Sequence, residues 1–170
     1  MKVELENVLP RDIEKRSFEI ITEELGDTPL IPGTELIVKR CIHTSADFEY
    51  TKTLMYSKDA VRIAQDLICE GADIVTDTNM ALAGINKKAL ATFGGEAHCF
   101  MADPEVARIA KERGTTRATV SMEMAARIDK PVIFAVGNAP TALIKIDKMM
   151  RESNWRPAFV IGVPVGFVNV

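Results

Sequence analysis

The chain has 170 residues, of which 47% are hydrophobic and 26% charged, and its formal net charge is −3 at pH 7. This length suits one ordinary domain, which buries roughly 70% of its unfolded surface and needs no disulfide or metal for stability. The 21 Lys and Arg residues are scattered, and no run approaches the roughly 20 apolar residues of a membrane span, so neither nucleic acid nor a membrane is the expected partner.

Two helices are predicted near the N-terminus. In the first, Asp12 to Leu25, apolar residues recur at helical spacing, Asp12 can cap the start and Gly26 can end it. In the second, Thr34 to His43, the spacing of the apolar residues fits a helix better than a strand. His43 then lies at a helix C-terminus, where the helix dipole favours the protonated imidazole of an exposed ring. We expect residues 1–45 to form a helical extension of a single domain, 1–170.

A regular alternation of helices and strands begins at Ser57. The clearest helix starts with Asp103 as N-cap and Pro104 as first residue, and it stops at Gly114. This pattern predicts an α/β fold with a mostly parallel open sheet and helices on both faces, a Rossmann-like three-layer sandwich. The predicted helices lie in 57–71, 86–93, 103–114, 116–128 and 139–153, and the strands in 73–77, 97–101, 131–137 and 158–164.

Small polar residues follow three of these strands, in segments 76–85, 137–143 and 162–167. Ligands of open parallel sheets bind beyond the carboxyl ends of the strands, and a helix N-terminus there can offer backbone N–H groups to an anion. Thr, Asn and Gly are also the residues that helix caps and tight turns require. Both readings of these segments therefore stay open.

Several common sites have no signature in the sequence. It contains no GxGxxG after a strand, no GxxxxGK[ST] and no GxSxG, which weakens nucleotide binding and serine catalysis as functions. The three cysteines, Cys41, Cys69 and Cys99, are far apart among apolar neighbours and predict buried, reduced thiols in a cytosolic protein. Neither Cys41 with His43 nor His98 with Cys99 has the spacing of a zinc pair, so no metal site is expected.

His43 stands in the stretch RCIHTSADF, and residue type alone allows three roles for it. It could be a core histidine bonded to a carbonyl, a metal ligand, or an acid/base at the mouth of a site. Perturbed histidines are only probabilistic markers of function, and on that ground the core role is favoured. The only other histidine, His98, follows a strand-like run, and we expect it to be structural.

Taken together, the motifs resemble the precorrin-8X methylmutase family, also called precorrin isomerase or cobalt-precorrin-8 methylmutase. The resemblance covers essentially the whole chain and rests on VKRCIHTSADFEY, VTDTNMALAGI, TTRATVSMEMA, GNAPTAL and GVPVGFVN in that order. It implies a cofactor-free isomerase of cobalamin biosynthesis, cytoplasmic and homodimeric. Such an enzyme moves a methyl group from C11 to C12 of precorrin-8X or cobalt-precorrin-8 and gives hydrogenobyrinate or cobyrinate.

The resemblance also implies roles for individual residues. The histidine of the IHxxxDF motif, here His43, is the implied proton donor. The substrate carries many carboxylates, which suit the planar guanidinium of arginine. The implied substrate-binding residues are Arg16, Ser17, Arg40, Thr78, Asn79, Arg117 and Asn138, for which helix caps or surface ion pairs are the structural alternatives. Met80, Leu82 and Val163 are expected either against the macrocycle or in the core.

The sequence departs from the family pattern at two places. Relatives are expected to continue past GFVN with a further helix and a basic, glycine-rich stretch, whereas this sequence stops at Val170. They also often have serine where this chain has Ala118. The resemblance makes the isomerase the leading hypothesis. The two departures keep open a second hypothesis, a non-catalytic corrinoid carrier of the same fold. A nucleotide-binding Rossmann-like protein is the weakest.

Overall fold

A computed structural model describes residues 6–166 of the chain. The chain divides into two compact units, Met1–Arg62 and Ile63–Val170. The boundary falls inside the helix α4 (Ala60–Cys69). The single-domain organisation of 1–170 stays a prediction.

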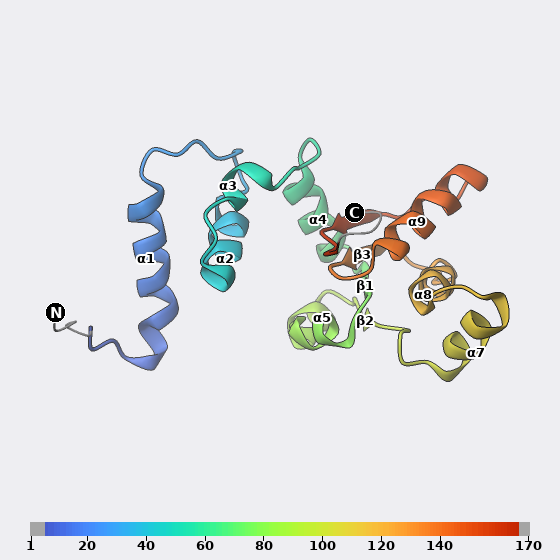
Figure 1. Ribbon diagram of the computed structural model, residues 1–170. Coiled ribbons are helices and arrows are strands. Elements are labelled where there is room, and N and C mark those ends of the chain that lie inside the picture. Colours follow the sequence, from blue (N-terminus) through green and yellow to red (C-terminus); the bar gives the residue numbers. More distant parts are fainter. Residues whose placement is uncertain (1–5, 167–170) are drawn as a thin grey trace. The chain divides into compact units, whose positions relative to one another are not determined.

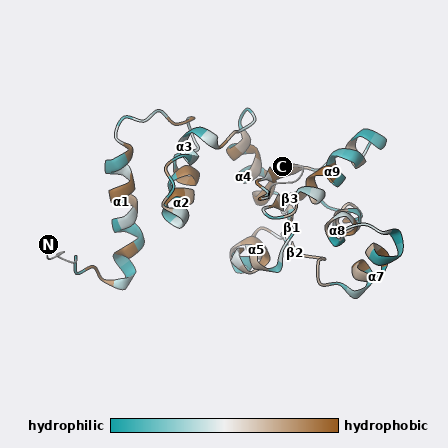
Figure 2. Ribbon diagram, in the orientation of Figure 1, coloured by the Kyte–Doolittle hydropathy of each residue, from teal (hydrophilic) through white to brown (hydrophobic). Residues whose placement is uncertain are grey.

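The first unit is helical. A short 3-10 turn, η1 (Pro10–Asp12), leads into α1 (Ile13–Leu25), which is followed by α2 (Glu35–Ser45) and α3 (Tyr50–Thr53). Hydrophobic and hydrophilic residues are interleaved along α1 (Figure 2), as expected for a helix with one apolar face. Its buried residues Ile21 and Leu25 form a small core with Val38 and Ile42 of α2. Both predicted N-terminal helices are therefore present.

The second unit contains a four-stranded sheet. The strands are β1 (Asp73–Thr76), β2 (Ala97–His98), β3 (Val132–Val136) and β4 (Phe159–Gly162), in the order β2-β1-β3-β4. Every neighbouring pair is parallel. The helices between them are α5 (Asn79–Gly84), α6 (Lys87–Thr92), α7 (Pro104–Arg113), α8 (Arg117–Ala125) and α9 (Pro140–Glu152). The predicted α/β class with a parallel sheet is confirmed.

Helices cover the sheet on both sides. Val75 of β1 and Phe134 of β3 are neighbours in register, and both are buried against Met122 of α8 and Ile146 of α9. The short helix α5 lies on the other side of the strands (Figure 1). Because the N-terminal ends of helices and the carboxyl ends of strands meet at one edge, the loops after β1 and β3 become neighbours.

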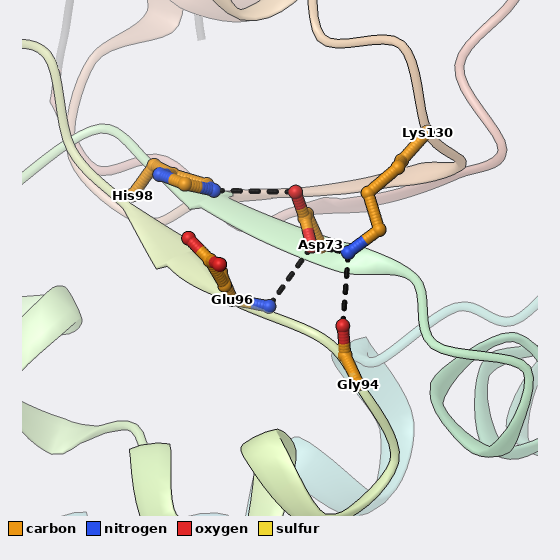
Figure 3. A network of polar contacts seen from close by, with 5 residues as sticks. All are labelled: Asp73, Gly94, Glu96, His98 and Lys130. Carbon is orange, nitrogen blue, oxygen red and sulfur yellow. Dashed lines mark hydrogen bonds and ion pairs between the residues drawn. The ribbon is translucent and has the colours of Figure 1, made fainter.

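A buried carboxylate at the start of β1 contacts β2 and the segments before β2 and β3. Asp73, only 4% exposed, accepts hydrogen bonds from Lys130 Nζ at 2.9 Å and from the Glu96 N–H at 2.9 Å, and it lies 3.2 Å from His98 Nε2 (Figure 3). Burial alone would raise the pKa of Asp73, but these three partners together lower it below its ordinary value. His98 is thus part of a structural network, as its sequence context predicts.

Some details differ from the sequence predictions. Only Ala97 and His98 of the predicted strand 97–101 pair with β1, and α5 was not predicted as a helix. The cysteines are free, but Cys69 is exposed and Cys41 and Cys99 are half-buried, so the prediction of buried thiols is wrong. Within residues 6–166, no helix is both long and apolar enough to cross a membrane.

Candidate functional site

The first two helices bring Ser17 and His43 together. Ser17, on α1, places its Oγ 2.7 Å from Nδ1 of His43, which lies in the last turn of α2 as predicted. The ring is solvent-exposed, so His43 is not a core histidine bonded to a carbonyl. Its other nitrogen, Nε2, has no hydrogen-bond partner within residues 6–166 and remains available to a ligand.

Phe18 and Arg40 surround this pair. The Phe18 ring lies 5.7 Å from the His43 ring, tilted by 45°, and the Arg40 guanidinium carbon lies 5.3 Å from the Phe18 centroid. Arg40 also forms a 2.7 Å ion pair with Glu14 of α1. The guanidinium is therefore fixed by a cation–π contact and a carboxylate, one turn of α2 before His43.

Arg16 binds a carboxylate through two hydrogen bonds. Its Nε and one terminal nitrogen donate to the two oxygens of Glu6, at 2.8 and 2.7 Å. These bonds and the positive charge of Arg16 lower the pKa of Glu6. The Arg16 guanidinium can bind a ligand carboxylate in the same bidentate way. In this structure the carboxylate of Glu6 is bound there.

A pocket of about 350 Å³ opens beside these residues. Its apolar walls come from both helices and from the loop after α2, and its polar groups include both members of the Ser17–His43 pair. Such a lining, mostly apolar with a few convergent polar groups, is typical of small-molecule sites. The wall residues include Ile13, Ile20, Ile21, Ile42 and Phe48, and the charged ones are Arg16 and Glu24.

The residues predicted after β1 and β3 lie in the second unit. Thr78 is the N-cap of α5, and its hydroxyl accepts the Ala81 N–H at 3.1 Å. Asn79, the first residue of α5, and Asn138, in the loop after β3, are both exposed. Thr78 thus has the structural role that was its alternative, and the two asparagines remain accessible to a ligand.

A buried aspartate binds the backbone amides of the loop after β3. Asp77 is fully buried, and its carboxylate accepts the N–H groups of Gly137, Asn138 and Ala139 at 3.1, 2.8 and 2.6 Å. For this loop the sequence left open whether the backbone amides hold a ligand anion or satisfy a turn. Because the Asp77 carboxylate occupies all three amides, they have the structural role. No local pattern marks this contact, since Gly137 lies 60 residues after Asp77.

Arg117 is the first residue of α8 and follows the N-cap Thr116. It is exposed, and its guanidinium forms no ion pair or hydrogen bond with another residue of the described range 6–166. Thr116 in turn bonds Thr141 of α9 at 3.1 Å, so Arg117 stands near the start of two helices. Of the apolar candidates, Met80 and Val163 are 85% and 51% exposed and do not belong to the core.

The comparisons with known proteins identify the family. The family model of precorrin-8X methylmutase matches residues 12–170. The chain belongs to the precorrin-8X methylmutase family. A methylmutase from Priestia megaterium, named cobalt-precorrin-8 methylmutase, is 42% identical over 95% of this chain and 72% of its own length. The enzyme of the same name from Salmonella typhimurium is 44% identical over 94% of this chain and 77% of its own.

A methylmutase of known structure has the same fold. The crystal structure of precorrin-8X methylmutase from Thermus thermophilus superposes with a TM-score of 0.81 at 39% identity, over 94% of this chain and 77% of that one. This methylmutase family contains intramolecular isomerases that transfer a methyl group, and family membership agrees with the resemblance drawn from the motifs. Within residues 6–166, no group of three or more His, Cys, Asp or Glu side chains is arranged to hold a metal ion.

Proposed function

We propose that this methylmutase moves the methyl group of precorrin-8X or cobalt-precorrin-8 from C11 to C12 and that His43 is the proton donor. The observation that carries the proposal is the exposed His43 ring, held at Nδ1 by Ser17, beside a mostly apolar pocket. Both sequence relatives described above are cobalt-precorrin-8 methylmutases, which favours the cobalt form as substrate.

The chemistry suits this arrangement. A methyl shift within a conjugated ring is unimolecular and needs no nucleophile or oxidant from the protein. A positioned acid can lower its barrier by giving a proton to the ring system and taking one back when the product forms. His43 Nε2 is the nitrogen free for this exchange, because Nδ1 already meets the Ser17 hydroxyl.

The pocket supports binding of one edge of the substrate. A volume of about 350 Å³ is at the lower end of the roughly 300–1,000 Å³ of ligand pockets, whereas a tetrapyrrole with its side chains is a large ligand. Arg16, which lines the pocket, and Arg40, one helical turn before His43, can bind substrate carboxylates once these displace Glu6 and Glu14. We propose Arg117, Asn79 and Asn138 as further substrate contacts.

We also propose that the protein is a cytoplasmic homodimer.

The test is turnover of both substrates, followed by absorbance, for the parent and for His43→Ala. We expect the parent to convert many equivalents of substrate and His43→Ala to lose about 100- to 10,000-fold in kcat while it still binds corrinoid. His98→Ala is the matched control, because it removes the other histidine and should lower the melting temperature more than the turnover of folded protein.

Two outcomes would contradict the proposal. A folded, corrinoid-binding His43→Ala protein that isomerises within a few-fold of the parent would exclude His43 as the acid. A parent whose spectral change stops at one equivalent of substrate would indicate a corrinoid carrier. A protein that stays monomeric in light scattering with full activity would remove the dimer from the proposal.

A further inference from the structure

The contact between Ser17 and His43 joins two helices across 26 positions of the sequence. We infer that Ser17 is a positioning residue: its hydroxyl occupies Nδ1 of His43 and restricts proton exchange with the substrate to Nε2. This inference rests on the proposed isomerase function, and it gives Ser17 a different role from the substrate contact that the family resemblance implies.

The other hydroxyl groups of α1 and α2 behave differently. Thr22, Thr44 and Ser45 each donate to the carbonyl oxygen four residues earlier, at 2.6, 2.8 and 2.7 Å. This is the usual arrangement of Ser and Thr within helices. Ser17 instead turns to a neighbouring helix and meets a ring nitrogen at 2.7 Å. Its orientation therefore serves a contact between helices and not the local backbone.

A hydroxyl suits this task because it can both donate and accept. When His43 is neutral with its proton on Nε2, the Ser17 O–H donates to Nδ1. When His43 is protonated, Nδ1–H donates to Ser17 Oγ, and Nε2–H is the proton that can leave. After that transfer the remaining proton stays on Nδ1 and is still donated to Ser17 Oγ, so Nε2 can accept the returning proton. The same 2.7 Å contact can persist through the whole exchange without a change in ring orientation.

The surroundings limit the ring as well. Phe18 packs against His43 with ring centroids 5.7 Å apart, and it follows Ser17 directly on α1. One side of the imidazole is thus held by an aromatic ring and one nitrogen by a hydroxyl. Without the hydroxyl the exposed ring can flip and present either nitrogen to the pocket. Correct placement of the reacting atom is then lost for part of the time.

The substitution Ser17→Ala tests this role cleanly. Alanine is the best helix former, so the variant should fold as well as the parent. We expect kcat to fall about 10- to 100-fold, by analogy with the loss seen when the hydrogen-bond partner that orients a metal-binding histidine is removed. The corrinoid dissociation constant should stay within about threefold. Ser17→Thr keeps the hydroxyl and should recover most of the activity.

A spectroscopic measurement separates orientation from catalysis. The chain contains only two histidines, so ¹⁵N-labelled histidine gives two sets of ring signals, assigned with the His43→Ala variant. In Ser17→Ala the Nδ1 signal of His43 should move toward that of a nitrogen without a hydrogen bond, while His98 is unchanged. Thr44→Ala is the matched control, because it removes a hydroxyl next to His43 that bonds the helix backbone, and it should change neither signal.

The outcomes distinguish the inference from the function beneath it. If Ser17→Ala weakens binding with kcat unchanged and leaves the Nδ1 signal in place, Ser17 is a substrate contact and the inference is wrong. If the Nδ1 signal moves as expected but the parent itself does not turn over substrate, the proposed function fails while the orienting contact stands.

Discussion

The Asp77 carboxylate should make a large and local contribution to the stability of the second unit. In Asp77→Asn the amide oxygen can replace Oδ2 and keep the bonds to Asn138 and Ala139, whereas the NH₂ group then faces the Gly137 N–H. One hydrogen bond to a charged group is lost, worth about 1.5–3 kcal/mol, and two others weaken. The neutral amide costs less to bury, which offsets part of this loss, so we expect about 2–3 kcal/mol.

Thermal unfolding and hydrogen exchange measure this loss. For a chain of this size, 1 kcal/mol shifts the melting temperature by roughly 2–4 °C, so the expected decrease is about 4–12 °C. The amides of the loop after β3 should also exchange faster. Asp103→Asn is the matched control, because Asp103 caps α7 and Asn caps helices as well as Asp does. If the two variants melt at the same temperature, the buried carboxylate does not stabilise the loop and the reasoning is wrong.

Three further predictions concern other parts of the second unit. The pKa of folded Asp73 is below its unfolded value, so its contribution to the free energy of unfolding is complete above about pH 4 and is lost as the pH falls through the folded pKa. In urea titrations, the free energy of unfolding of Asp73→Asn should therefore depend less on pH at the acid end. Arg117→Lys should weaken corrinoid binding about tenfold by fluorescence or absorbance titration, because an ammonium cannot bind a carboxylate bidentately, and an unchanged affinity would exclude the contact. A Cβ at Gly95 would collide with the Ala72 carbonyl oxygen and approach Leu90 within 2.9 Å, so Gly95→Ala should cost about 1–3 kcal/mol in urea unfolding; equal stability would show that the neighbours yield freely.

Local chemistry made most helices predictable. The helix α7 has Asp103 as N-cap, Pro104 as first residue and Gly114 as C-cap, as predicted. The six-residue helix α5 was missed because it is short and its Met80 is 85% exposed, so no apolar stripe marks it. The predicted strand 97–101 was too long. Its length depends on pairing with β1, and the last pair joins Val75 to His98. Strand length at a sheet edge is a tertiary property that periodicity does not contain.

The candidate site was predictable only in part. The motif identified His43, and helix periodicity placed it correctly in the last turn of α2. The glutamates that bind Arg16 and Arg40 were not anticipated, because they lie 10 and 26 residues away. The same holds for Asp77, which takes the three amides of the loop after β3. Long-range polar pairing decides which groups are free for a ligand, and no local pattern reports it.

The order of the strands also bears on how the protein forms during synthesis. The central strand β1 has only the two-residue β2 as partner until β3 is made, and the Asp77 contact with Gly137 spans 60 residues. At roughly 5–20 residues per second, the ribosome needs about 3–12 s for that interval. Throughout it Ile74 and Val75 lack their neighbours Ile133 and Phe134. We expect nascent chains that end before Val132 to bind chaperones and to be cleaved readily by protease within residues 63–131, and chains that include β3 to become protected.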